Sequence, residues 1–240
     1  MEEKNPFDSI KTYDNYTHLW QLTAFVFFLQ ILAGLLSYLL ARISGFKLTA
    51  LEIFILPMLI SVYVCWVALE GMGVSWAAAM KDWDAKARKD LLKALKYFGG
   101  YLLLMASIVV LIIAFFYLFG IDESVLGNAP DMFDALMAES AASAPRYLLL
   151  LFMSCALTPI MEEILFRRIM FTTIRRKNRF WLSALISGLL FALFHGKTAL
   201  MVFPVGLYLC WVYERERRLP VNIMLHGLIN MGVTVFKTLA

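Results

Sequence analysis

Six polar side chains interrupt three apolar stretches in the second half of the sequence. They are Glu162, Glu163, Arg167, His195, His226 and Asn230. An ionised group inside a bilayer costs at least about 2.5 kcal/mol, so polar residues retained there indicate a function. Peptide hydrolysis needs a base that activates water, donors that stabilise an oxyanion, and a proton for the leaving amine. Carboxylates, imidazoles and a side-chain amide can together meet these three needs.

The spacing of these residues predicts how they face one another. Glu163 and Arg167 are four residues apart with the acid nearer the N-terminus, which favours an ion pair on one helix. Glu162 then points about 100° away from Glu163, so it needs partners on other helices, and the two histidines are the candidates. His226 and Asn230 are also four apart and can present two hydrogen-bond donors to one point.

Pro159 lies about one turn before the two carboxylates. A proline removes one main-chain hydrogen bond, so we expect a local opening there that admits water or a peptide. A second mechanism could use the same residues, because two histidines and a glutamate also form a catalytic zinc set with the other glutamate as base. The zinc ligands would be Glu162, His195 and His226, although the sequence contains no His-Glu-x-x-His motif.

The rest of the sequence must hold these side chains inside a membrane. Of the 240 residues, 61% are hydrophobic, and the mean hydropathy is +0.73, outside the range of ordinary soluble domains. Apolar runs of about 17 to 24 residues recur along the chain, and each can cross about 30 Å of hydrocarbon as a helix. We therefore predict an all-α polytopic membrane protein with about seven transmembrane helices. They are expected at 19–40, 49–69, 97–119, 147–169, 180–195, 198–213 and 219–239.

The distribution of basic residues predicts the orientation of these helices. Connections 1–18, 71–96, 167–179 and 214–218 carry 17 of the 22 Lys and Arg residues. The positive-inside rule places these connections, and the N-terminus, in the cytoplasm. The connection 121–145 then lies on the outer face with its acidic residues Asp122, Glu123, Asp131, Asp134 and Glu139. The expected location is an integral multi-pass position, in the cell membrane if the source is bacterial.

Charge and periodicity also predict partners and domain organisation. Residues 79–96 alternate apolar and basic faces at helical spacing, which predicts an amphipathic helix lying on membrane lipid. Because the other basic residues flank apolar spans, we expect no nucleic-acid partner. The chain divides into a cytoplasmic N-terminal segment 1–18, N-terminal transmembrane helices with their connections in 19–145, and a catalytic core in 146–240.

Three short motifs in the catalytic core resemble those of a known family. They are Glu162-Glu163-x-x-x-Arg167, Phe191-x-x-x-His195 and His226-x-x-x-Asn230. In this order and on separate apolar segments, they resemble the motifs of the CPBP family, which includes the CaaX prenyl endopeptidases and the bacterial Abi proteins. The resemblance covers about residues 146–236. Arg168 departs from it, because the family often has glycine there, and this affects local helix packing.

The resemblance implies a peptidase mechanism without a metal. Glu162 is then the general base, and His195 helps to hold the water. His226 and Asn230 form the oxyanion hole, and Glu163 with its partner arginine orients the site. We favour this route over zinc because an asparagine suits an oxyanion hole better than a metal site. The implied substrate is a membrane-associated peptide or the C-terminal tail of a lipidated protein, of the CaaX or peptide-maturation type.

Two functions of other classes use the same residues. Intramembrane glutamates and histidines also carry protons or ions in transporters and channels. A transporter predicts an inverted repeat or broken helices in both halves, and the sequence shows neither. A non-catalytic immunity or scaffold protein would need none of the motif residues, and their presence argues against that alternative.

Overall fold

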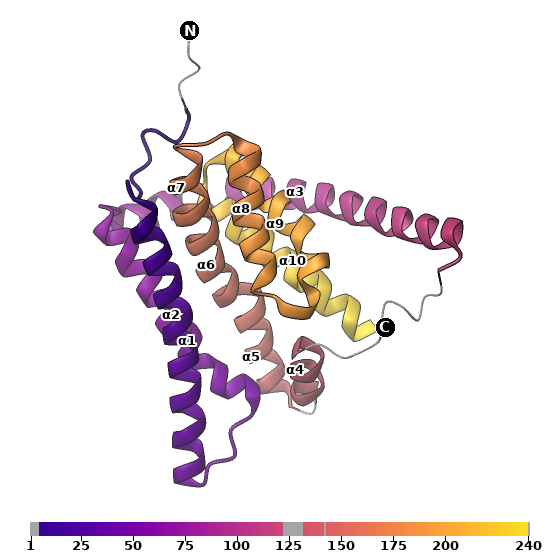
Figure 1. Cartoon of the computed structure of the whole chain (residues 1–240). Helices are drawn as coiled ribbons and strands as arrows, with labels where there is room; N and C mark the ends of the chain where they lie inside the picture. Colours follow the sequence, from indigo (N-terminus) through magenta and orange to yellow (C-terminus); the bar gives the residue numbers. More distant parts are fainter. Residues whose placement is uncertain (1–4, 122–131, 142, 240) are drawn as a thin grey trace.

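The structure is a computed structural model that describes residues 5–121, 132–141 and 143–239 (Figure 1). Within these residues the chain forms helices and no strand. The elements are α1 (Tyr16–Ser44), α2 (Ala50–Gly71), α3 (Trp76–Phe119), α4 (Met132–Ala141), α5 (Ala144–Phe152), η2 (Met153–Leu157), α6 (Thr158–Glu162), η3 (Glu163–Phe171), α7 (Thr172–Arg175), α8 (Phe180–Leu193), η4 (Gly196–Thr198), α9 (Ala199–Glu216) and α10 (Leu219–Leu239). Asp122, Glu123 and Asp131 of the predicted acidic loop lie outside the described residues.

Six helical segments of the described chain are long and apolar enough to cross a membrane, and α8 is a shorter apolar helix. The six are 16–44, 50–71, 76–119, 144–175, 196–216 and 219–239. The 14 residues of α8 span about 21 Å, which is less than the hydrocarbon thickness. This architecture confirms the predicted all-α polytopic membrane fold, with α8 as the helix that is too short to span unaided.

Local signals explain where the first two helices begin and end. The Asn15 side chain accepts a hydrogen bond from the Thr17 N–H, which caps α1, and Gly45 ends that helix at a positive φ of 75°. Thr49 and Glu52 form a capping box at the start of α2, each side chain bonding the other's backbone. The two helices pack against each other as a hairpin along one side of the bundle (Figure 1).

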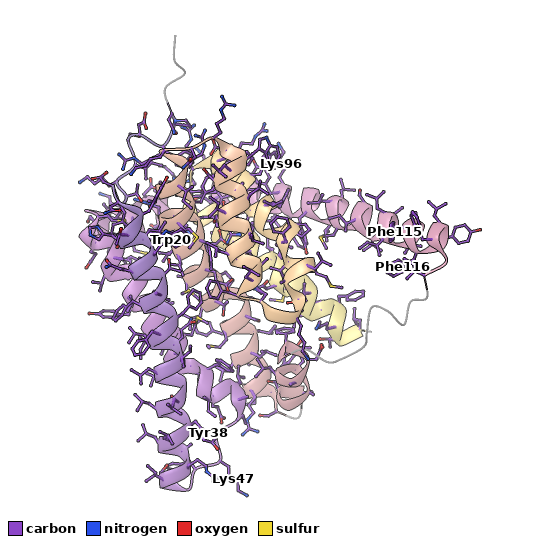
Figure 2. All side chains as sticks on the ribbon, viewed as in Figure 1. Trp20, Tyr38, Lys47, Lys96, Phe115 and Phe116 are labelled. Atoms are coloured by element: carbon purple, nitrogen blue, oxygen red, sulfur yellow. The ribbon has the colours of Figure 1, made fainter. Side chains whose placement is uncertain are left out.

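The helix α3 differs from the expected arrangement. We predicted an interfacial helix at 79–96 and a separate span at 97–119, but the structure has one helix of 44 residues. No proline interrupts it, and Gly100 lies within it where the Tyr208 side chain of α9 approaches closely. The half of α3 that carries Phe115 and Phe116 projects away from the bundle (Figure 2).

Ion pairs hold the basic half of α3 at one end of the bundle. Arg218, in the turn between α9 and α10, bonds both carboxylate oxygens of the buried Asp90 and also contacts Asp82. The hydrogen bonds to Asp90 raise the pKa of Arg218 above its ordinary value. Lys93 pairs with Glu216 in the same region. Connections 71–96 and 214–218 therefore lie together, as the count of basic residues predicted.

The segment 144–175 is the central helix of the bundle. Of the 18 consecutive residues that are most apolar in this segment, 44% are buried inside the protein, whereas 0% are buried in the corresponding stretch of α3. It is continuous but irregular, because the two segments η2 and η3 have π-helical hydrogen bonding on either side of α6. Segments of π-helix within α-helices occur frequently at functional sites.

The helices α8, α9 and α10 enclose the central helix on the side away from α1 (Figure 1). The helices α8 and α9 form the predicted hairpin, in which Gly196 adopts a positive φ of 58°. A segment before α1 also packs on this half: the ring of Phe7 is fully buried against Phe171 and Tyr213. This packing places the two carboxylates of the central helix opposite α10.

Candidate active site

Glu163 is held by three partners in the interior of the bundle. Its side chain and that of Arg167 are both 0% exposed, and the Arg167 Nη1 lies 3.1 Å from the Glu163 Oε1. The predicted ion pair on one helix is therefore present. His226 Nδ1 lies 2.9 Å from the same oxygen, and Asn222 Nδ2 donates to Oε2 at 3.2 Å. Glu163 is thus a fully engaged carboxylate.

Glu162 has the opposite environment, although it is the neighbouring residue. Its side chain is 12% exposed, and the buried Oε2 has no hydrogen-bond partner among the described residues. That oxygen lies 3.6 Å from His226 Nε2, which is too far for a direct hydrogen bond. Because an unpaired buried carboxylate oxygen is costly, it indicates a position for water or substrate.

His226 bridges the two glutamates with its two ring nitrogens. An ionised carboxylate only accepts hydrogen bonds, so the network assigns a proton to the Nδ1 that faces Glu163. In the neutral imidazole, Nε2 then carries a lone pair toward Glu162. Two acceptors at this separation need a shared proton or a water that donates to them. The geometry therefore favours a proton or a water molecule between Glu162 and His226.

The Glu163–Arg167 pair is supported by an aromatic ring and a main-chain carbonyl. The guanidinium carbon of Arg167 lies 4.3 Å from the centroid of the Phe191 ring, within the range of a cation–π contact. Arg167 Nη2 also lies 3.5 Å from the Gly206 oxygen. Phe191 belongs to the second motif, and its position shows that this residue packs against the charged pair. Its ring therefore joins the second motif to the first.

Asn230 bonds the backbone of the central helix. Its Nδ2 donates to the Ser154 carbonyl at 2.7 Å. That carbonyl has no helical donor, because the Thr158 N–H bonds Met153 and residue 159 is a proline without an N–H. The expected opening at Pro159 is thus occupied on one side by an amide from α10. One of the two N–H groups of Asn230 remains for another acceptor.

A close approach of two helices makes this bond feasible. A Cβ added to Gly227 would overlap the Cys155 carbonyl oxygen, so only glycine permits this separation between α10 and the central helix. Gly227 follows His226 directly, so the approach that it permits also sets the distance from the imidazole to the glutamates.

His195 lies at the edge of this cluster. It follows the end of α8, and its Nδ1 lies 2.8 Å from the Phe191 carbonyl. Its ring centroid is 4.6 Å from that of Phe191, which in turn is 5.7 Å from that of His226. In the described residues, His195 makes no hydrogen bond to either glutamate or to His226. The carbonyl accepts from Nδ1, which leaves Nε2 of His195 free to accept a hydrogen bond.

Two residues of the site were not predicted from the sequence. Asn222 lies four residues before His226, and its amide also donates to the Leu209 carbonyl at 2.9 Å. The signal was a third polar residue at i, i+4, i+8 on α10, together with His226 and Asn230. Ser154 contributes only its main chain, so no side-chain pattern could have indicated it.

The zinc alternative requires Glu162, His195 and His226 to converge on one point. Among the described residues, no three His, Cys, Asp or Glu side chains are arranged to hold a metal ion. The alternative ligands Glu162 and His226 face each other, and the Phe191 ring contacts both His226 and His195.

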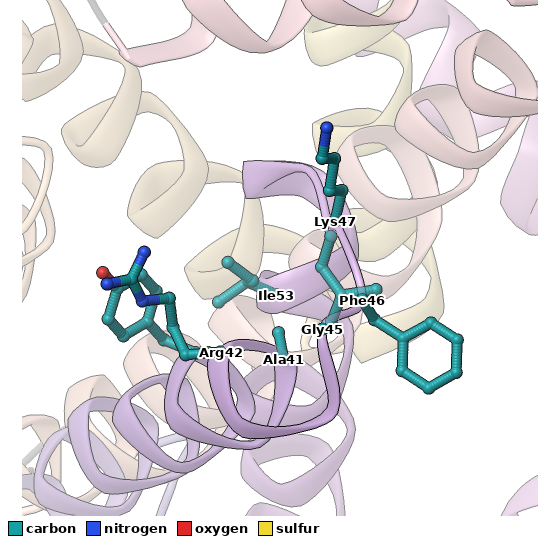
Figure 3. Close-up of a pocket in the computed structure, with 8 residues that line it drawn as sticks. Ala41, Arg42, Gly45, Phe46, Lys47 and Ile53 are labelled. Atoms are coloured by element: carbon teal, nitrogen blue, oxygen red, sulfur yellow. The ribbon is translucent and has the colours of Figure 1, made fainter.

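Two surface hollows lie away from the carboxylates. One, of about 360 Å³, lies at the turn between α1 and α2 beside Arg42 and Lys47 (Figure 3). The other, of about 620 Å³, lies at the turn between α7 and α8. Neither is lined by a residue of the predicted catalytic set.

Comparisons with known proteins agree with the position of the cluster. Residues 144–232 match the family described as type II CAAX prenyl endopeptidase Rce1-like. The Bacillus subtilis (strain 168) protein named putative membrane peptidase YdiL is 29% identical over 124 residues, which are 51% of this chain and 47% of that protein. The match thus spans about half of that relative's length. No solved structure matches the chain. All three motifs of the expected CPBP resemblance lie within 144–232, the segment that is similar to this family.

Proposed function

We propose that this chain is an intramembrane endopeptidase in which Glu162 activates the water that attacks a peptide bond. The unpartnered Oε2 of Glu162, 3.6 Å from an imidazole nitrogen, carries this proposal. A general base must have an oxygen free for the water, and the neighbouring Glu163 has neither of its oxygens free. The similarity of residues 144–232 to a family of prenyl endopeptidases supports the same reaction class.

The proton balance of the reaction needs only residues of the cluster. Glu162 takes a proton from water as the water oxygen bonds to the substrate carbonyl carbon. The tetrahedral intermediate then breaks its C–N bond, and the protonated Glu162 gives the proton to the departing amine. His226 Nε2 faces Glu162 and can share that proton between the two steps. Glu163 and Arg167 keep the imidazole in the required tautomer.

Two groups are available for the oxyanion. The second N–H of Asn230 is one donor, because its first N–H bonds Ser154. His226 is the other while its Nε2 carries the water proton that it shares with Glu162, and both side chains come from one face of α10. In this proposal His195 accepts a hydrogen bond from the attacking water through its free Nε2. That contact requires the water or the substrate to lie between His195 and the glutamates.

The substrate that we propose is a membrane-associated peptide or the C-terminal tail of a lipidated protein. The family that residues 144–232 resemble is described as type II CAAX prenyl endopeptidase, and a prenylated tail enters a membrane with its lipid. The site lies inside helices that are apolar enough to span the bilayer. A peptide held close to the membrane by a lipid is therefore concentrated at this depth.

The decisive experiment compares two variants with the same chemical change. Glu162→Gln removes the base and keeps the size of the side chain, so cleavage of a fluorogenic farnesylated CaaX peptide should fall to background. Glu70→Gln makes the same change at an exposed position at the end of α2 and should leave cleavage unchanged. An unprenylated peptide of the same sequence tests whether the lipid is needed. An active Glu162→Gln protein would refute the proposal.

A chelator separates the metal-free route from the zinc route. In the proposed reaction, exhaustive chelation leaves the wild-type protein active. If chelation abolished cleavage and zinc restored it, the assignment would change to a metalloprotease with Glu162, His195 and His226 as ligands. If no peptide were cleaved under any condition, the non-catalytic alternative would gain support.

A further inference from the structure

A basic hollow lies at the turn between α7 and α8. This hollow, here called the α7–α8 hollow, has a volume of about 620 Å³. Its lining includes Arg175, Arg176, Lys177 and Arg179, four cations within five residues, and one acid, Glu214. None of these residues belongs to the proposed catalytic set, so the hollow needs a separate explanation.

The positive charge of the hollow is only partly neutralised. Arg175 donates hydrogen bonds of 2.9 to 3.1 Å to both oxygens of Glu214, so these two charges neutralise each other. Arg176 has one counter-ion, Asp14, at 3.3 Å, and the Asp14 side chain is 93% exposed. Lys177 bonds a main-chain carbonyl, which carries no charge. Arg179 makes no ion pair among the described residues, so an excess of positive charge remains.

The N-terminus of α8 adds to this excess. Arg179 is the N-cap residue of α8, and no side chain caps the helix. The N–H groups of the first turn therefore lack a side-chain acceptor, and the helix dipole places a partial positive charge there. Phe180, the first residue of α8, lines the hollow. An anion in the hollow can meet guanidinium groups and helix N–H groups together.

The neighbouring apolar residues indicate that the anion belongs to a lipid. Trp181 is 69% exposed and Leu182 is 49% exposed, directly after the residues that line the hollow. Exposed tryptophan is enriched at the level of lipid headgroups, and basic pockets between transmembrane helices bind anionic headgroups. We propose that the α7–α8 hollow binds the phosphate of an anionic lipid, whose acyl chains lie against Trp181 and Leu182. Inorganic phosphate has the same charge chemistry but no chains to use that surface.

Lipid titration of the full-length protein in detergent micelles tests this proposal. The thermal unfolding temperature is measured with increasing phosphatidylglycerol, with phosphatidylcholine, and with inorganic phosphate. Phosphatidylglycerol should stabilise the wild type most. A basic residue near a lipid surface contributes about 1 kcal/mol, so Arg179→Gln should weaken the apparent affinity about fivefold. Adding Arg176→Gln should weaken it about twenty-five-fold in all.

Arg88→Gln is the matched control, because it removes one exposed arginine of α3 outside the hollow. It should keep the wild-type affinity, which distinguishes a site from general attraction to a basic surface. Equal weakening by Arg88→Gln and Arg179→Gln would overturn the proposal. Equal stabilisation by phosphatidylcholine would also overturn it, and an equal effect of inorganic phosphate would overturn the assignment to a lipid. None of these results depends on peptidase activity, so they leave the proposed function untouched.

Discussion

Replacing Arg167 with methionine should destabilise the protein and stop the proposed reaction. Arg167 and Glu163 are both 0% exposed, so the variant leaves a carboxylate in the interior without its counter-ion. Removal of one partner from a buried ion pair costs about 3 to 5 kcal/mol. At about 2 to 4 °C per kcal/mol for a chain of this size, the unfolding temperature should fall by about 6 to 20 °C.

A second substitution distinguishes the effect of the unpaired Glu163 charge from the effect of losing the Arg167 side chain. Glu163→Gln in the Arg167→Met protein removes the stranded charge, and the glutamine oxygen can still accept the bond from His226. Replacing a buried ion pair by neutral groups of similar size is often nearly neutral for stability. The double variant should therefore regain most of the lost unfolding temperature. It should remain inactive, because a neutral glutamine does not stabilise the protonated His226 that the proposed reaction needs.

Thermal unfolding in detergent micelles measures both variants, and peptide cleavage is recorded in parallel. Lys86→Met is the control, because Lys86 and Asp82 form the same i, i+4 pair on the exposed face of α3. Exposed pairs contribute little to stability, so its unfolding temperature should match the wild type. The reasoning fails if Arg167→Met unfolds at the wild-type temperature, or if the double variant is no more stable than the single one.

Three further predictions follow from the packing of α10 and from the distribution of charge. Asn230→Ala removes a proposed oxyanion donor, so turnover should fall about 100-fold to 1000-fold. It also leaves the Ser154 carbonyl unpaired, so the free energy of unfolding should fall by about 1 to 3 kcal/mol, and an unchanged unfolding temperature would contradict this bond. Gly227→Ala should destabilise by about 1 to 3 kcal/mol, measured by thermal unfolding, because its Cβ forces α10 away from the central helix. In intact cells, a cysteine replacing Lys47 should react with an impermeant thiol reagent and one replacing Lys177 should not; the reverse result would invert the topology.

The three polar residues of α10 act on one neighbouring helix in different ways. Asn222 and His226 bond the side chain of Glu163, whereas Asn230 bonds a main-chain oxygen of the same helix. All three lie on one face at intervals of four residues, so a small rotation of α10 would break every bond together. We therefore expect the unfolding temperature and the activity to change together in variants along this face.

The sequence by itself determined the class of fold, and it predicted the members of a catalytic set. Apolar runs long enough to cross a bilayer predicted the polytopic membrane fold, because that property depends only on local composition. The Glu163–Arg167 pair was also predictable, because both residues lie on one helix and their separation is set by its period. The three motifs predicted candidate catalytic residues, and the segment that contains them is the one that is similar to the prenyl endopeptidase family.

Only the tertiary structure decided how these residues share their partners. Which of Glu162 and Glu163 keeps an oxygen without a hydrogen-bond partner depends on which side of the central helix faces α10. No local sequence pattern specifies that rotation. The loss of a hydrogen bond at Pro159 was predictable, but the amide of Asn230 that bonds the freed Ser154 carbonyl comes from 76 residues away. Likewise, the packing of α3 against α10 joins segments that are far apart in the sequence. Contacts within one helix follow from spacing, whereas contacts between helices depend on how their surfaces pack.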